Sequence, residues 1–373
     1  MHSVSSGSAS VTGIVASRER SFPVEIDTAG AAGAAANTTP DTSMDFTGTA
    51  GATGAAGALD TVSQDSVRLR VGCEFQLESE FPVPMLMLVR AHPNGEHRTL
   101  YESRWTKPEV PLHEYVDSFG NFCWRFSTPG GPFTLRYDAM VETVREPDPI
   151  HPGVPLTPVQ DLPDETLVFT LPSRYVQSDL LLDQAWTLFG NTDPTWARVQ
   201  AVCDWVHTNI RYETGSSGPA TTALDVFESR VGVCRDFALL SVALCRALNI
   251  PARYTFGYLP DIAVEPPDVP MDFHAWFEAY LGGRWYTFDA RHNRPRIGRV
   301  IVGYGRDAID VALSTSYGAV QLNSMTVWSD EIHPDGGDEH LREDDPPSDF
   351  QDDPQPDAQR LPQAAHQSSP LSE

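Results

Sequence analysis

The chain has few basic residues and no long hydrophobic run. Its 26 Lys and Arg residues stand against 51 Asp and Glu residues, which gives a formal net charge of -25. A nucleic-acid backbone or an anionic membrane would repel such a chain, so neither is expected as a partner. No stretch approaches the roughly 18 apolar residues of a membrane span. The first residues, MHSVSSGSASVTGIVASRERSF, lack the apolar run of a signal peptide, so a cytoplasmic protein is expected.

Paired cysteines are also missing. The five cysteines are an odd number, and none belongs to a CxxC motif. Such spacing fits neither a disulfide framework nor a zinc ribbon, which indicates a reducing compartment and no metal or cofactor. All but Cys234 fall in predicted strands or on apolar helical stripes, where cysteine is usually a small packed hydrophobe. The five are Cys73, Cys123, Cys203, Cys234 and Cys245.

Composition divides the chain into four regions. Residues 1–65 are rich in Ala, Gly, Ser and Thr, which predicts a disordered leader. Residues 66–171 contain short segments of alternating hydrophobicity separated by turn clusters, typical of a β-sandwich-like domain. Residues 172–328 combine helical patterns with strands and form the second predicted domain. The acidic, Pro-rich residues 329–373 are predicted to be a disordered tail.

Cys234 lies in the sequence GVCRDFALL, where a helix is predicted to begin. An apolar helical pattern starts at Asp236 and ends before Pro251, because proline disfavours helix at the residue before it. The amino end of a helix favours negative charge, so it should favour the thiolate of Cys234. Its backbone N–H groups could also hold an oxyanion formed at that sulfur. A nucleophilic cysteine still needs a base and a group that orients the base.

A downstream hairpin offers these two groups. Gly282-Gly283 favours a two-residue primed turn between the strands HAWFEAYL and RWYTF. The register that follows makes His274 and Asp289 diagonal neighbours on one sheet face, roughly 7–8 Å apart at the backbone. An imidazole and a carboxylate can bridge that distance. A one-residue bulge would instead turn Asp289 to the other face.

The blocks GVCRDFALL and MDFHAWFEAYLGGRWYTFDARHN resemble the transglutaminase-like superfamily, specifically its bacterial cysteine peptidase type with a papain-like fold. The resemblance covers about residues 171–328. It implies an α+β fold, in which a helix bundle packs on an antiparallel sheet, preceded by the β-domain. It also implies Cys234 as nucleophile, His274 as general base and acid, and Asp289 as the group orienting the imidazole. The implied activity is acyl transfer or hydrolysis on a peptide, protein or other amide through a thioester.

Departures from the family limit what the resemblance implies. Transglutaminases proper carry Gln-Cys-Trp, whereas this chain has Val-Cys-Arg, so protein crosslinking does not carry over. The tryptophan that gives those enzymes a second oxyanion donor has no secure counterpart, because Trp205 falls in a predicted helix and is expected to pack. Arg235 and Asp236 are expected to form an ion pair at the helix start.

Other interpretations remain open at the level of sequence. The papain-like core could be a non-catalytic binding module, and the substrate could be a non-protein amide. His207 and His292 could join Cys234 in a metal site, but no spacing resembles a zinc signature. Ser216-Ser217 lacks the Gly-x-Ser-x-Gly elbow of serine hydrolases, although this loop is a candidate border of the cleft. The sequence does not specify an oligomeric state.

Overall fold

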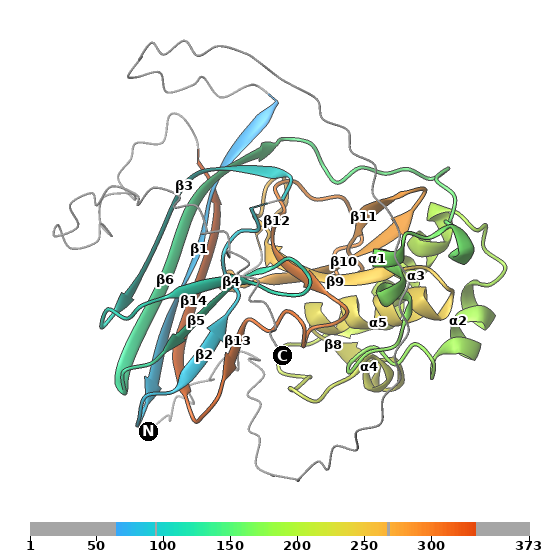
Figure 1. Ribbon diagram of the computed structural model, residues 1–373. Coiled ribbons are helices and arrows are strands. Elements are labelled where there is room, and N and C mark those ends of the chain that lie inside the picture. The colour runs from blue at the N-terminus through green and yellow to red at the C-terminus, as the bar shows by residue number, and fades with distance from the viewer. Residues whose placement is uncertain (1–64, 94, 267–268, 333–373) are drawn as a thin grey trace, which may run out of the picture. The chain divides into compact units, whose positions relative to one another are not determined.

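The computed structural model describes residues 65–332, except residues 94 and 267–268 (Figure 1). The predicted leader, apart from residue 65, lies outside the described residues. So does the predicted tail, apart from residues 329–332. Of these, residues 329–331 end a β-strand.

Six antiparallel strands follow the first described residue. In the two 14-residue strands, β1 and β6, the alternating burial reflects the period-two pattern of the sequence, with one face in the core. They contribute to two four-stranded sheets, ordered β14-β1-β6-β3 and β13-β2-β5-β4. Trp124 of β5 meets Tyr137 of β6 edge to face, with ring centroids 5.7 Å apart, so the two sheets share a core. The strands are β1 (Ser66–Ser79), β2 (Pro84–Met87), β3 (His97–Lys107), β4 (His113–Val116), β5 (Phe122–Ser127) and β6 (Gly131–Val144).

The last two described strands return to these sheets. β13 (Ser314–Ser316) pairs with β2, and β14 (Gln321–Glu331) pairs with β1 along most of its length. The predicted domain boundary at residue 328 therefore falls inside β14. The α+β region lies in sequence between β6 and β13, so it is inserted into the β-rich domain.

Helices dominate the first half of the inserted region. Residues 159–170 contain three short helical turns. The apolar periodicity of residues 199–210 belongs to an α-helix capped by the Thr195 hydroxyl. A two-stranded parallel pair joins β7 (Arg211–Tyr212) to β8 (Val231–Gly232). The helices are η1 (Val159–Asp161), α1 (Asp164–Leu167), η2 (Val168–Thr170), α2 (Leu182–Phe189), α3 (Trp196–Asn209), α4 (Ala223–Ser229) and α5 (Cys234–Ala247).

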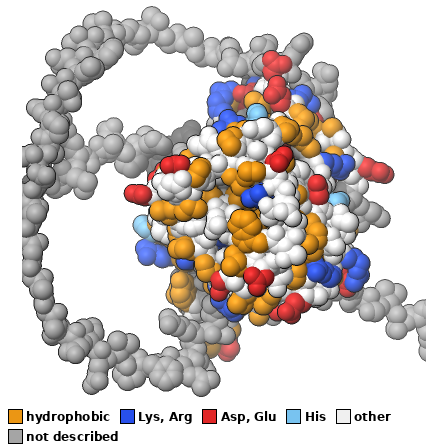
Figure 2. Space-filling model, turned by 90° about the vertical axis from the view of Figure 1, so that its right-hand side faces the viewer, with side chains coloured by type: hydrophobic (Ala, Val, Ile, Leu, Met, Phe, Trp, Pro, Cys, Tyr) orange, Lys and Arg blue, Asp and Glu red, His pale blue; other side chains and the backbone are white. Residues whose placement is uncertain are grey.

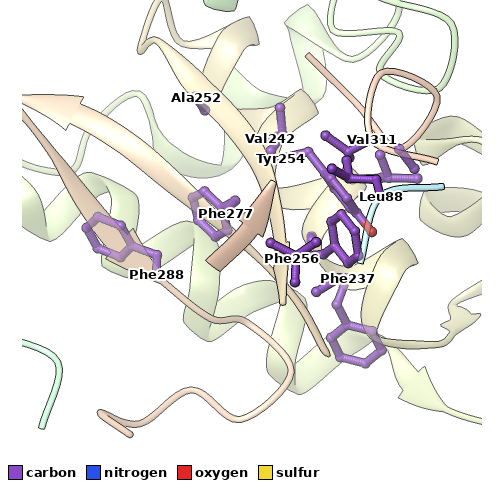
Figure 3. Close-up of a cluster of buried hydrophobic side chains, with 14 of the residues drawn as sticks. Leu88, Phe237, Val242, Ala252, Tyr254, Phe256, Phe277, Phe288 and Val311 are labelled. Atoms are coloured by element: carbon purple, nitrogen blue, oxygen red, sulfur yellow. The ribbon is translucent and has the colours of Figure 1, made fainter. Parts of the chain in front are cut away.

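A third antiparallel sheet, ordered β11-β10-β9-β12, supports these helices. Figure 3 shows Phe237 and Val242 of α5 in one apolar cluster with Tyr254, Phe256 and Phe277 of the sheet, all of them buried. A helix layer on an antiparallel sheet confirms the predicted α+β fold. The strands are β9 (Ala252–Tyr258), β10 (His274–Leu281), β11 (Arg284–Phe288) and β12 (Val300–Gly305).

The third sheet is joined to the β-rich domain by buried hydrogen bonds. The Tyr258 hydroxyl donates to the Val89 carbonyl over 2.7 Å, and the Asn121 amide donates to the Tyr304 carbonyl over 2.9 Å. On the helical side of the molecule, Figure 2 shows apolar side chains interspersed with charged ones. None of the helices in the described ranges has the length and apolarity needed to cross a membrane.

Candidate active site

Cys234 is the first residue of α5, as the sequence predicts. The Asp236 carboxylate accepts a hydrogen bond from the Val233 backbone N–H over 2.8 Å and caps the helix. Arg235 forms the expected ion pair with Asp236 at 3.0 Å and also donates to the Gly218 carbonyl over 2.9 Å. The fully buried Asp236 thus fixes the start of the helix and, with it, the position of the Cys234 thiol.

The other four cysteines occupy different surroundings. Cys234 is partly exposed, whereas the other four side chains are buried. Burial raises the pKa of the Cys73 thiol to about 12 and that of Cys123 to about 11. It also raises the pKa of Cys203 and Cys245. These four thiols are therefore protonated and poorly reactive at neutral pH.

The hairpin of β10 and β11 has the predicted register. Leu281 pairs with Arg284, and the pairing continues without a bulge to the end of β11. Gly282 and Gly283 have φ angles of 53° and 93°, which the primed turn requires. His274 begins β10 and Asp289 follows β11, and the His274 Nε2 and Asp289 Oδ2 atoms lie 2.8 Å apart.

Asp289 is held as a buried carboxylate. One oxygen, Oδ1, accepts the backbone N–H groups of Arg291 and His292 at 3.0 and 3.1 Å. The other, Oδ2, faces His274 and accepts from Arg299 over 2.9 Å. Burial alone would raise the pKa of Asp289, but the charges of His274 and Arg299 hold it well below its ordinary value. The carboxylate is therefore ionised across the physiological pH range.

His274 is partnered by Asp289. Burial alone would lower the pKa of His274, but the charge and hydrogen bond of Asp289, with a further contribution from Cys234, raise it to about 9. The imidazole is therefore charged at neutral pH. Nε2 faces Asp289, so Nδ1 is the ring nitrogen that remains for another partner.

Two further residues complete the surroundings of Asp289, and sequence reasoning missed both. The Arg299 guanidinium, 6% exposed, bridges Asp289 and Asp148, with both ion pairs at 2.9 Å. It also lies 5.0 Å from the centroid of the Trp276 ring. Asp148 comes from the Pro-rich segment between the domains, and Arg299 precedes β12. Neither residue belongs to a local motif that could have indicated the contact.

Two of the remaining sequence candidates pack without contacting Cys234. Trp205 stacks on Phe227, with centroids 5.5 Å apart, and lies under the Arg230 guanidinium, as expected for a packing residue. His207 Nδ1 contacts the Ala290 carbonyl at 3.1 Å, which is a structural role.

The Ser216-Ser217 loop adjoins the start of α5. Arg235 bonds to the Gly218 carbonyl at its end, and the Glu213 N–H donates to the Gly232 carbonyl over 3.1 Å. The Ser216 and Ser217 hydroxyl oxygens are buried and have no hydrogen-bond partner among the described residues. The loop therefore lies beside the helix start that carries Cys234.

His292 lies against the catalytic candidate His274. Their ring centroids are 4.7 Å apart, and the planes meet at 48°. Burial, together with the charges of His274, Arg296 and Arg291, lowers the pKa of His292 to about 3. The His292 ring is therefore neutral beside the charged His274 ring.

A family model and a solved structure resemble this chain. The model of the transglutaminase-like superfamily matches residues 185–290, which include Cys234, His274 and Asp289. The crystal structure of a candidate cysteine protease from Cytophaga hutchinsonii is 34% identical, with a TM-score of 0.67, and the match covers 73% of this chain and 93% of that chain. The chain belongs to the transglutaminase-like superfamily. Membership supports a catalytic function of the general papain-like kind.

Mycobacterial proteins are also similar to this chain. The uncharacterized protein ML0607 of Mycobacterium leprae is 29% identical over 217 residues, covering 56% of this chain and 76% of its own length. The uncharacterized protein Rv2569c of Mycobacterium tuberculosis is 27% identical over 217 residues, covering 52% of this chain and 68% of its own length.

Proposed function

We propose that this transglutaminase-like protein is a cysteine-dependent hydrolase or acyltransferase acting on peptide or other amide bonds. Cys234 is the nucleophile, His274 the general base and acid, and Asp289 the group that orients the imidazole. The observation that carries the proposal is the 2.8 Å contact between His274 Nε2 and the buried Asp289 carboxylate, with the partly exposed Cys234 at the start of α5 close enough to influence the titration of His274. The Cytophaga relative, a candidate cysteine protease, supports the same chemistry.

Acylation begins with the Cys234 thiolate and the charged His274 ring. The sulfur attacks the amide carbonyl carbon, and the carbonyl oxygen becomes an oxyanion. The first N–H groups of α5 have no acceptor within the helix, so they can donate to this oxyanion. As the C–N bond breaks, His274 gives its proton to the leaving amine. A thioester between Cys234 and the acyl group remains.

Deacylation reverses the proton transfer. The neutral His274 ring takes a proton from a water molecule or from an acceptor amine, which attacks the thioester carbon. The C–S bond breaks, and Cys234 returns as a thiolate beside the charged imidazole. Water yields a carboxylic acid, whereas an amine yields a new amide. Asp289 keeps its charge throughout and stabilises the imidazolium.

Selective alkylation tests the proposal. Native protein treated with low iodoacetamide at neutral pH should be labelled at Cys234, because burial raises the pKa of the other four thiols. His274→Ala removes the neighbouring positive charge and should slow labelling of Cys234 by at least about tenfold. Peptide mass spectrometry locates the modified residue, and the denatured chain gives the rate of an ordinary thiol. Labelling of Cys234 at the denatured rate in both proteins would favour a non-catalytic binding module.

A further inference from the structure

A cluster of three metal-binding side chains surrounds the catalytic imidazole. One ligand atom each from His274, Asp289 and His292 lies within 4.8 Å of the other two. The cluster forms because the His292 N–H donates to Asp289 Oδ1, which turns the chain after β11 back toward β10. The spacing of these residues in the sequence matches no zinc motif, since the ligands come from different segments of the chain.

The donor set matches zinc. Zn²⁺ binds imidazole nitrogen and carboxylate oxygen at about 2.0–2.2 Å, usually with tetrahedral geometry. An ion at the centre of a triangle with sides of 4.8 Å would lie roughly 2.8 Å from each ligand atom, so each ligand needs to move by less than about 1 Å. Small side-chain rotations can supply that movement. Mg²⁺ and Ca²⁺ prefer oxygen ligands, so two imidazoles select against them.

His292 is suited to this role because its ring forms no hydrogen bond with any residue that the structure describes, although its backbone N–H does. It is partly buried, and one of its ring nitrogens lies within 4.8 Å of ligand atoms of His274 and Asp289. The charge of Arg299 on Asp289 opposes cation binding, which favours reversible binding over a permanent structural ion.

We propose that His274, Asp289 and His292 form an inhibitory Zn²⁺ site, in which the metal occupies the imidazole needed for acyl transfer. Zinc displaces the His274 proton directed at Asp289, and that proton leaves to solvent. Nδ1 keeps its own proton, so the metal-bound ring has no lone pair with which to accept a proton, and donating one would leave an imidazolate. The inhibition rests on the proposed function, whereas metal binding at these three residues does not.

Calorimetric titration of ZnCl₂ into the full-length Cys234→Ala variant tests the binding, because this variant removes the thiol as an alternative ligand. We expect one strong Zn²⁺ site per chain and no such site for MgCl₂ or CaCl₂. Adding His292→Phe should weaken the Zn²⁺ affinity by about 100-fold, and His292→Gln should do the same without adding bulk. The matched control is His113→Phe, an exposed histidine of β4, which should leave the affinity unchanged. Equal affinity with and without His292 would overturn the proposal, as would the absence of a strong site.

Turnover tests the link to catalysis. Stoichiometric Zn²⁺ should slow turnover of an amide substrate by the wild-type protein at least about tenfold, since the metal-bound ring no longer exchanges a proton, and a chelator should restore the rate. The ratio of rates with and without Zn²⁺ should approach one in His292→Gln. Inhibition that persists in His292→Gln would place the metal elsewhere and refute the assigned ligands. If the protein turns over no amide even without metal, the proposed function fails while the titration still decides the zinc site.

Discussion

Replacing Arg299 by methionine removes one charge from a buried network and leaves two carboxylates behind. Arg299 is 6% exposed, Asp289 2% and Asp148 18%, and both ion pairs measure 2.9 Å. Breaking a buried ion pair from one side typically costs about 3–5 kcal/mol, because the remaining charge is desolvated without compensation. With roughly 2–4 °C lost per kcal/mol in a chain of this size, the melting temperature should fall by about 6–20 °C.

The matched control is Arg98→Met. Arg98 also contacts a carboxylate, that of Glu142 at 2.7 Å, but its side chain is 60% exposed. An exposed pair contributes about 0–1 kcal/mol, so this variant should unfold close to the wild type. Urea denaturation followed by tryptophan fluorescence measures both free energies of unfolding.

The pH dependence of Arg299→Met gives a second readout. Arg299 is one of the charges that hold the pKa of Asp289 far below its ordinary value. This carboxylate therefore stabilises the fold above about pH 4, the pKa of an unfolded aspartate, and the contribution declines at lower pH. In Arg299→Met the Asp289 carboxylate contributes less stability, so less is lost on acidification. The difference in free energy of unfolding between the variant and the wild type should therefore narrow below about pH 4. If Arg299→Met lost no more free energy of unfolding than Arg98→Met, the stabilising role of the buried network would be refuted. A difference from the wild type that did not change with pH would refute it as well.

Three further perturbations test the site and its supports. Asp289→Asn should lower turnover of an amide substrate by roughly 10²- to 10⁴-fold yet leave more activity than Cys234→Ala, and equal activities would show that Asp289 does more than orient the imidazole. The pKa of His274 is about 9 when folded against about 6.5 when unfolded, so its contribution of about 3 kcal/mol is complete below pH 6.5 and lost as the pH rises through 9. In His274→Ala, the free energy of unfolding measured with urea should no longer fall between pH 6.5 and 9. Gly283→Ala places a side chain at φ 93°, which should cost about 1–2 kcal/mol in the same assay although nothing lies near its Cβ.

The parts of the site that are encoded locally could be predicted from the sequence. The Gly282-Gly283 turn fixes the register of its two strands, so the meeting of His274 and Asp289 follows from counting residues. The position of Cys234 follows from an apolar helical pattern that starts beside it. In both cases the residues that determine the position belong to the same helix or hairpin as the side chain that they position.

Contacts between distant segments could not be predicted in this way. Asp148 and Arg299 are separated by 151 positions, and each lies in a stretch without periodicity. The pairing of β14 with β1 likewise cannot be predicted from either strand, because an alternating pattern does not specify which strand lies next to it. The clustering of His292 with His274 depends on how the chain turns after β11, which composition does not encode.

The insertion of the α+β region into the β-rich domain has a consequence for how the protein is made. β1 lies between β6 and β14, and β14 ends at Glu331. A nascent chain can pair β1 with β6 early, but the other side of β1 keeps free N–H and C=O groups until residues 321–331 have left the ribosome. A chain that terminates after β12 would contain every residue of the candidate site and still present an open sheet edge. The first sheet can therefore be completed only after every residue of the candidate site has been synthesised.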